Sequence, residues 1–317
     1  MLSGGVPPGR LRSRLMIAVA GEALIDLILS PDGTLTANPG GGPYNAARTI
    51  ARLGGSALFV GRLSDDRFGT LLHSRLEADG VDLSSAPRTS DPTTLAVAEL
   101  DAGGAATYHF YFAGTSAPGL TEADLADGLP AHTQALHVGT LGLALEPMAS
   151  TYEALVAGLD PGVLVLVDPN CRPTVIKDGA SYRARLARVL ARTDVVKVSG
   201  DDLEWLTPGV PALDSARALL DAGPQVVLLT DGAAGVHVLT PTAELSVDVP
   251  RVDVVDTVGA GDSFGGAFVH AWCAAGHDRS DLGDLDALRV AVEFAVRVAA
   301  LTCQRQGADP PFAADLG

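Results

Sequence analysis

The sequence predicts an α/β fold in which a mostly parallel β-sheet is covered by helices on both faces. Short apolar runs alternate along the chain with segments whose apolar residues recur every three or four positions, which is typical of alternating strands and helices. This order builds parallel strands joined by covering helices. Hydrophobic residues make up 47% of the 317 residues, enough for a single large core.

The central strands are expected at six apolar runs, namely residues 16–20, 57–61, 135–138, 163–167, 195–198 and 226–230. The helices between them are expected at residues 46–53, 68–79, 148–157, 182–191 and 212–222. Two longer helices, at residues 263–275 and 288–304, close the chain. A further strand is expected at residues 252–255, leading into the first of these two helices.

Two regions have strand character without intervening helices, residues 23–40 and 93–113. Within the second, residues 107–112 alternate as one arm of a hairpin around a turn at residues 101–104. These segments could extend the main sheet, but we expect a small separate sheet, because no helices are available to cover them. Such a sheet could close over the ligand as a lid and exclude water.

Composition limits the possible partners and compartment. The formal net charge of −16 argues against nucleic acids and anionic membranes as partners. Three widely spaced cysteines suit a reducing compartment and have no metal-binding spacing. Residues 1–15 are expected to be a disordered leader before a domain at 16–317, since Glu22 and Asp26 interrupt the apolar run that a signal peptide needs. With no apolar segment long enough to span a bilayer, we expect a soluble, cytoplasmic protein.

The stretch DTVGAGDSFGGAF, residues 256–268, carries the clearest chemical signal. Gly259, Ala260 and Gly261 have side chains no larger than a methyl group, so their backbone N–H groups can approach an anion at a helix N-terminus. Asp262 places a carboxylate at the same point. A phosphate cradle beside an acid or base is what phosphoryl transfer requires.

Other interpretations of this stretch exist. Asp262 could be only a helix N-cap, and the motif alone leaves cap and catalyst equally open. A dinucleotide-binding fingerprint would need a small residue in place of Phe264 and an N-terminal position. No glycine turn is followed by Lys and Ser or Thr, so any nucleotide phosphate must be held without a P-loop lysine.

A second glycine cluster, PGGGPYNAARTIARLGG, spans residues 39–55. Gly41 and Gly42 would let a ligand touch the backbone, and Asn45 could bond a hydroxyl, although a plain loop with an Asn cap is the simpler interpretation. Asp26 lies in an apolar strand, so its charge is at an exposed strand end or in a pocket.

Together these stretches resemble the ribokinase, or PfkB, family of sugar kinases. Both glycine motifs occur in the family's order, and GEALIDLI, HVGTLGL, VDPNCRP, VVKVSGDDLEWL and VVLLTDGAAG match between them. The resemblance covers residues 17–310 and is nearest to the fructokinase branch. It implies a ribokinase-like three-layer sandwich with a small β-sheet lid, ATP with Mg²⁺, and activation by K⁺. The exposed edge strands of the lid suggest a homodimer formed through it.

The resemblance also implies roles for individual residues. Asp262 would be the base, and Gly259, Ala260 and Gly261 the anion hole. The sugar would be bound by Asp26, Gly41, Gly42, Asn45, Tyr108, Phe110 and Arg172. The nucleotide would be bound by Asn170, Arg172, Ser199, Thr230, Gly232, Gly235, Gly259 and Gly261. Asp202 would belong to the hydrogen-bond network around Mg²⁺ and the phosphates. A monovalent cation would be bound by Asp256, Val258 and Gly307.

Two departures from the family pattern affect these expectations. The family often has Glu where this chain has Asp202, one methylene shorter. Many relatives carry Tyr-Arg in the lid where this chain has Tyr111 and Phe112, which favours a neutral sugar. We therefore expect fructose or a close ketose as substrate, then 2-keto-3-deoxygluconate, then a nucleoside. A non-catalytic sugar-binding scaffold and a dinucleotide-dependent oxidoreductase are the alternatives from other classes.

Overall fold

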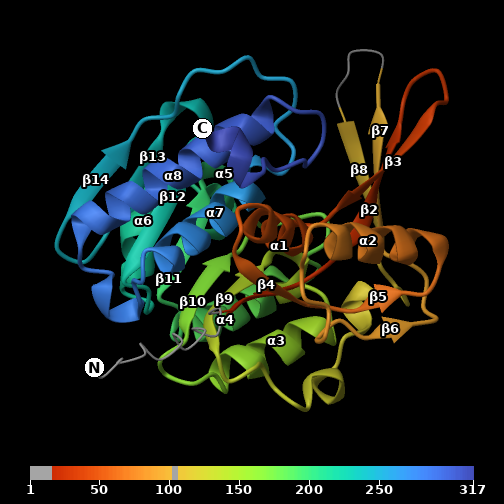
Figure 1. The fold of residues 1–317 in the computed structure, drawn as a ribbon, viewed down its shortest axis with the longest axis horizontal. Helices are drawn as coiled ribbons and strands as arrows, with labels where there is room; N and C mark the ends of the chain where they lie inside the picture. Colours follow the sequence, from red (N-terminus) through yellow and green to blue (C-terminus); the bar gives the residue numbers. More distant parts are fainter. Residues whose placement is uncertain (1–15, 102–105) are drawn as a thin grey trace, which may run out of the picture.

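A computed structural model describes residues 16–101 and 106–317 of the chain (Figure 1). The leader expected at residues 1–15 and residues 102–104 of the expected hairpin turn lie outside this described part. A central sheet of eight strands, in the order β14-β13-β12-β11-β10-β9-β1-β4, forms the middle layer. Its strands are β1 (Met16–Ala20), β4 (Ser56–Val60), β9 (Thr133–Gly139), β10 (Leu164–Asp168), β11 (Val195–Ser199), β12 (Val226–Thr230), β13 (Val236–Leu239) and β14 (Glu244–Val247).

The sheet is parallel except at one edge, where β13 and β14 run antiparallel to their neighbours. The six strands expected from apolar runs are therefore confirmed, each within a few residues. The antiparallel pair was missed because each strand has only four residues.

Helices cover both faces of this sheet, as the sequence predicted. One face is packed by α1 (Gly42–Arg52), α2 (Arg67–Ala78), α7 (Ala260–Ala274) and α8 (Leu285–Cys303). The other is packed by α3 (Met148–Ala157), α4 (Gly179–Leu190), α5 (Gly200–Leu206) and α6 (Ala212–Leu220). Several helices begin earlier than the apolar pattern indicated, because Pro43 and the capping side chains of Asp178 and Asp284 start them before the first apolar residue.

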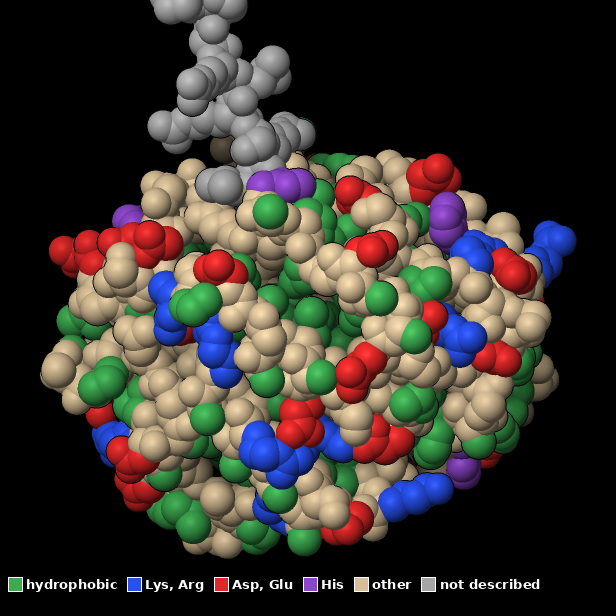
Figure 2. Space-filling view, turned by 90° about the horizontal axis from the view of Figure 1, so that it is seen from below, with side chains coloured by type: hydrophobic (Ala, Val, Ile, Leu, Met, Phe, Trp, Pro, Cys, Tyr) green, Lys and Arg blue, Asp and Glu red, His purple; other side chains and the backbone are tan. Residues whose placement is uncertain are grey.

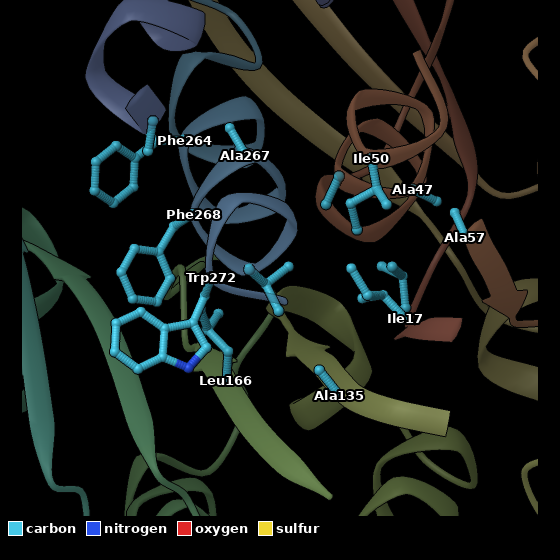
Figure 3. Packing of buried hydrophobic residues seen from close by; sticks show 14 of the residues in the cluster. Ile17, Ala47, Ile50, Ala57, Ala135, Leu166, Phe264, Ala267, Phe268 and Trp272 are labelled. Atoms are coloured by element: carbon cyan, nitrogen blue, oxygen red, sulfur yellow. The ribbon is translucent and has the colours of Figure 1, made fainter. Parts of the chain in front are cut away.

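The core between α7 and the sheet fixes the position of the chain's main motif. Phe264, Phe268 and Trp272 project from α7 toward the sheet, where Leu166 lies beneath them (Figure 3). The rings of Phe268 and Trp272 stack with their centroids 6.2 Å apart. Burying one large apolar side chain contributes about 1.5–3 kcal/mol, so three of them anchor the helix firmly. The first turn of α7 is thereby held in place above the sheet.

A separate four-stranded sheet projects from the body, in the order β3-β2-β7-β8 (Figure 1). Its strands are β2 (Leu24–Leu29), β3 (Leu35–Gly40), β7 (Leu95–Leu100) and β8 (Ala106–Tyr111). They come from the two regions for which a small sheet was expected. A two-stranded sheet of β5 (Leu63–Ser64) and β6 (Arg88–Thr89) completes the strands of the described chain.

The strand expected at residues 252–255 does not form, so that prediction was wrong. Val254 and Val255 are exposed there, at 62% and 63% of their surface. The backbone N–H groups of Val255 and Asp256 donate to the carbonyl of Cys303 at 2.8 and 3.2 Å, which ties this segment to the end of α8. The strand that precedes α7 is β14, and a loop joins the two.

The surface carries charges of both signs. On the face seen from below the view of Figure 1, basic and acidic side chains are interspersed (Figure 2). Ion pairs between α4 and the region of α3 follow this pattern, with Arg185 and Arg188 both contacting Glu153. Within residues 16–101 and 106–317, no helix has both the length and the apolarity needed to cross a bilayer.

Candidate active site

The glycine motif forms a tight turn into α7. Gly259 precedes the helix with φ 77°, a left-handed conformation that favours glycine. A Cβ on Gly259 would lie 2.5 Å from the Cβ of Ala308, so the close approach of residue 308 also requires glycine. Because the first N–H groups of a helix have no partner within it, Gly261 and Asp262 present donors and positive potential at this end. This local structure is suited to binding an anion.

Asn45 and Asp262, far apart in sequence, meet at this turn. The Asn45 Nδ2 donates to Asp262 Oδ2 at 2.9 Å. Asn45 is buried on the first turn of α1, and its own Oδ1 has no hydrogen-bond partner among the described residues. A Cβ on Gly42 would lie 3.1 Å from Asp262 Oδ1, so Gly42 leaves room beside that oxygen. The two glycine motifs thus form the two walls of one site.

Asp26 faces the same site from the small sheet. It pairs with Asn38 across β2 and β3, and a Cβ on Gly40 would collide with its Oδ2. Burial and the negative charge of Asp262 raise the pKa of Asp26 to about 6, while the positive charge of Arg172 opposes the shift. Asp26, Asp262 and Arg172 are therefore electrostatic neighbours.

Glu22 borders the candidate site and was not predicted from the sequence as one of its residues. Its Oε1 accepts from the Gly42 N–H at 3.2 Å, and its carboxylate accepts from the Thr140 hydroxyl at 2.5 Å. Burial raises the pKa of Glu22 to about 7. Thr140 follows β9 with φ 54°, an unusual conformation for a residue with a side chain. The available signal was an acidic residue within the apolar run GEALIDLI, which contains Glu22 as well as Asp26.

The carboxyl ends of the central strands gather the predicted nucleotide residues. Ser199 and Thr230 are register neighbours at the ends of β11 and β12. Gly232 and Gly235, in the loop after β12, have φ 48° and 126°, so this loop depends on glycine. Placement of these residues along one sheet edge follows the general rule for ligand sites in parallel sheets.

The predicted residues after β10 lie at the same edge of the sheet. Asn170 has φ 37°, and the Arg172 guanidinium donates to its carbonyl at 3.2 Å. Asp202 links this loop to β11: its Oδ1 accepts from the Cys171 N–H at 2.7 Å and its Oδ2 from the Ser199 hydroxyl at 2.6 Å. Ser199 and Asp202 form a capping box that begins α5. Their observed contacts are structural, and a role of Asp202 toward Mg²⁺ stays a prediction.

Asp256 joins the two loops expected to hold a monovalent cation. Its Oδ2 accepts from the Gly307 N–H at 2.9 Å, and its Oδ1 accepts from the Val258 N–H at 3.1 Å. In the described part of the chain, no group of three or more His, Cys, Asp or Glu side chains is arranged to hold a metal ion. A cation here would need backbone carbonyls besides Asp256.

The aromatic residues expected at the sugar lie on β8. Tyr108 and Phe110 share one face of the strand, with ring centroids 6.3 Å apart. Tyr108 is 49% exposed, and Phe110 packs partly against the core. Their part in sugar binding stays a prediction.

The comparison with known families identifies the class of protein. The sequence profile of the pfkB family carbohydrate kinases matches residues 14–314. The chain belongs to the PfkB family of carbohydrate kinases. It is accordingly an ATP-dependent phosphotransferase, and the family resemblance of its two glycine motifs is confirmed.

Several relatives and solved structures that the chain resembles are fructokinases. A fructokinase of Rhizobium leguminosarum bv. trifolii is 40% identical over 257 residues, covering 78% of this chain and 77% of the relative. The structure of a fructokinase from Xylella fastidiosa with bound ATP matches with a TM-score of 0.87 at 30% identity, covering 96% of this chain and 97% of that one. A fructokinase double mutant of Vibrio cholerae O395, with fructose, ADP and potassium ion bound, matches with a TM-score of 0.85 at 28% identity, covering 96% and 97%.

Proposed function

We propose that this kinase transfers the γ-phosphoryl group of ATP to a hydroxyl of fructose or a close ketose. The observation that carries the proposal is the junction of the two glycine motifs, where Asn45 holds the Asp262 carboxylate at the N-terminus of α7. Asp26 borders the same space as a hydrogen-bond acceptor for sugar hydroxyls. The 40% identity to a fructokinase supports the choice of sugar. Phe112, which stands in the lid where many relatives carry Arg, supports a neutral substrate.

Asp262 acts as the base in this reaction. As the sugar oxygen bonds to the γ-phosphorus, its proton passes to the Asp262 carboxylate, and the bond to the β–γ bridging oxygen breaks with its electron pair leaving on ADP. A free Asp has a pKa of about 3.9, too low to deprotonate an alcohol beforehand. In a loose transition state the proton moves late, so orientation and charge stabilisation matter more than basicity. The backbone N–H groups of Gly259–Gly261 stabilise the negative charge.

Mg²⁺ would enter with ATP, held mainly by phosphate oxygens and water, and would help to neutralise the charge of the transferring group. The Ser199 hydroxyl and the loop of Gly232 and Gly235 face the nucleotide. Asp202 would act on this metal through a water molecule, because its side chain is one methylene shorter than the Glu that the family often has there and its carboxylate is held by Cys171 and Ser199.

A panel of sugars tests the substrate assignment. ADP release is measured with fructose, 2-keto-3-deoxygluconate, a purine nucleoside and no acceptor. Fructose is expected to give the largest increase in turnover. If another acceptor gives a larger increase in turnover, that acceptor is the substrate and the fructose assignment is wrong. No increase with any acceptor would favour a sugar-binding scaffold.

The kcat/KM for fructose should depend on the protonation of the Asp26 carboxyl. Below its pKa of about 6 the carboxyl is protonated and accepts hydroxyl hydrogen bonds poorly, so kcat/KM for fructose is expected to fall as the pH drops through 6. Arg172 lowers this pKa, so Arg172→Leu should move the acid limb to higher pH. Arg188→Leu, exposed on α4, is the matched control and should leave the limb in place. A limb that shifts equally in both variants would contradict the role of Asp26.

Potassium should activate the enzyme. Asp256 and residues 302–307 flank the turn at Gly259, and each Asp256 oxygen retains a lone pair beside its backbone hydrogen bond. With carbonyls such as those of Val258 and Gly307, this donor set suits a hard cation. Turnover is expected to be higher in K⁺ than in Na⁺ or choline at equal ionic strength. Equal turnover in all three would leave Asp256 a purely structural link between loops.

We also propose that the enzyme is a cytoplasmic homodimer joined through the small sheet. Leu35 and Tyr111 lie on the same face of this sheet and each expose 58% of their surface, which supplies apolar area for a second copy. Light scattering should give twice the monomer mass, and Tyr111→Lys should shift it toward the monomer. A monomeric wild type would contradict the dimer.

A further inference from the structure

A buried ion pair lies beneath the anion-binding turn. The Lys197 Nζ on β11 is 3.0 Å from Asp168 Oδ2 on the neighbouring strand β10, and the two side chains are 6% and 2% exposed. A Cβ on Gly261 would lie 3.0 Å from this ammonium. The cation is therefore packed against the backbone that forms the first turn of α7.

The charge environment keeps Lys197 cationic. Burial lowers the pKa of Lys197, but the carboxylates of Asp168, Asp202 and Asp262 outweigh burial and raise it. The positive charge of Lys197 also acts on His137. Burial lowers the pKa of His137 to about 4, and the charge of Lys197 contributes to that shift. The site thus contains one buried ammonium among several carboxylates.

Stability does not explain this pair well. Burying two charges costs about as much as their attraction returns, and an apolar pair of the same size is often as stable. The Asp168 Oδ1 is buried without a hydrogen-bond partner in the described chain, which adds to the cost. Burial raises the pKa of Asp168 to about 6, despite the opposing charge of Lys197. The Lys197–Asp168 pair therefore adds little to stability and leaves one carboxylate oxygen without a hydrogen bond. Its position next to the proposed reaction centre points to a role in the reaction.

We propose that Lys197, held by Asp168, is a positioning residue that supplies positive charge beneath the anion hole of Gly259–Gly261. This inference rests on the proposed function. The γ-phosphoryl group must approach a space already bordered by the carboxylates of Asp26 and Asp262, whose charges repel it and which Arg172 opposes with a single positive charge. The chain has no P-loop lysine, and Lys197 provides a fixed charge from below the turn instead. It acts through space and through the backbone of Gly261, without being the base.

The test replaces the charged pair with a neutral one. The double variant Lys197→Met/Asp168→Asn leaves no unpaired buried charge, and Lys177→Met, the other lysine of the chain, is the control. We expect kcat with fructose to fall about 10- to 100-fold, less than the roughly 10²–10³-fold lost with a group that contacts the transition-state charge directly, because Lys197 acts through Gly261. The KM for fructose should change less than about threefold. Thermal melting checks the fold, and Lys197→Gln carries the same test if the double variant does not fold.

A second readout separates charge stabilisation from structural support. Aluminium fluoride with ADP and fructose imitates the transferring phosphoryl group, and it should tighten ADP binding in the wild type and the Lys177→Met control. We expect the double variant to lose most of this tightening while binding ADP alone normally. A folded variant with kcat within twofold of wild type, or with the tightening intact, would overturn the inference. A wild type without sugar-dependent ADP release would overturn the proposed function itself.

Discussion

Asp262→Asn is expected to lower kcat by about 10²–10⁴-fold, the usual contribution of a general base, while ATP binding stays near normal. The amide keeps the shape of the side chain and retains an oxygen that can accept the hydrogen bond from Asn45. It cannot take up the proton of the sugar hydroxyl. Steady-state ADP release gives kcat, and titration calorimetry gives the affinity for ATP.

Asp201→Asn is the matched control, because Asp201 is exposed on the first turn of α5 and should tolerate the change. A mutant at position 262 that retains more than about a tenth of the wild-type rate would remove the base assignment. Asp262 would then be only a cap that helps to begin α7.

Asp79→Ala is expected to destabilise the protein by about 1–3 kcal/mol, because the buried Arg48 and Arg52 lose one carboxylate partner and keep only Asp309, which is 45% exposed, as a second one. The Asp79 carboxylate receives Arg48 Nε at 2.6 Å and Arg52 Nε at 2.9 Å, and all three side chains are less than 10% exposed. The same arginines bind the carbonyls of Ala308 and Pro310. Since Ala308 packs on Gly259, this network supports the anion-binding turn from behind.

Chemical denaturation measures the loss of stability. Asp82→Ala is the control, because Asp82 is exposed and bonds only the nearby Ser84 N–H among the described side-chain contacts. Asp82→Ala should lower the free energy of unfolding by about 0.5 kcal/mol or less. Equal stability losses in the two variants would contradict a supporting role for Asp79.

The order of strands and helices and the location of the main site could be predicted from the sequence. Strand and helix periods are local signals, and Gly259–Asp262 form one contiguous motif. Pairing between distant residues could not be predicted. Lys197 meets Asp168 only because β10 and β11 are neighbours in register, and Asp79 meets Arg48 only because α1 packs beside the end of α2. Residues 252–255 were misassigned because an apolar run resembles a strand even when it is held as an exposed loop.

The most direct test of phosphoryl transfer at Asp262 follows the phosphorus itself. ATP, Mg²⁺ and fructose are incubated with the enzyme, and ³¹P NMR records the products. The account predicts a sugar phosphomonoester signal that grows in equal amount with ADP, and its loss in Asp262→Asn. Formation of ADP with inorganic phosphate alone, or an unchanged ester signal in the variant, would contradict it.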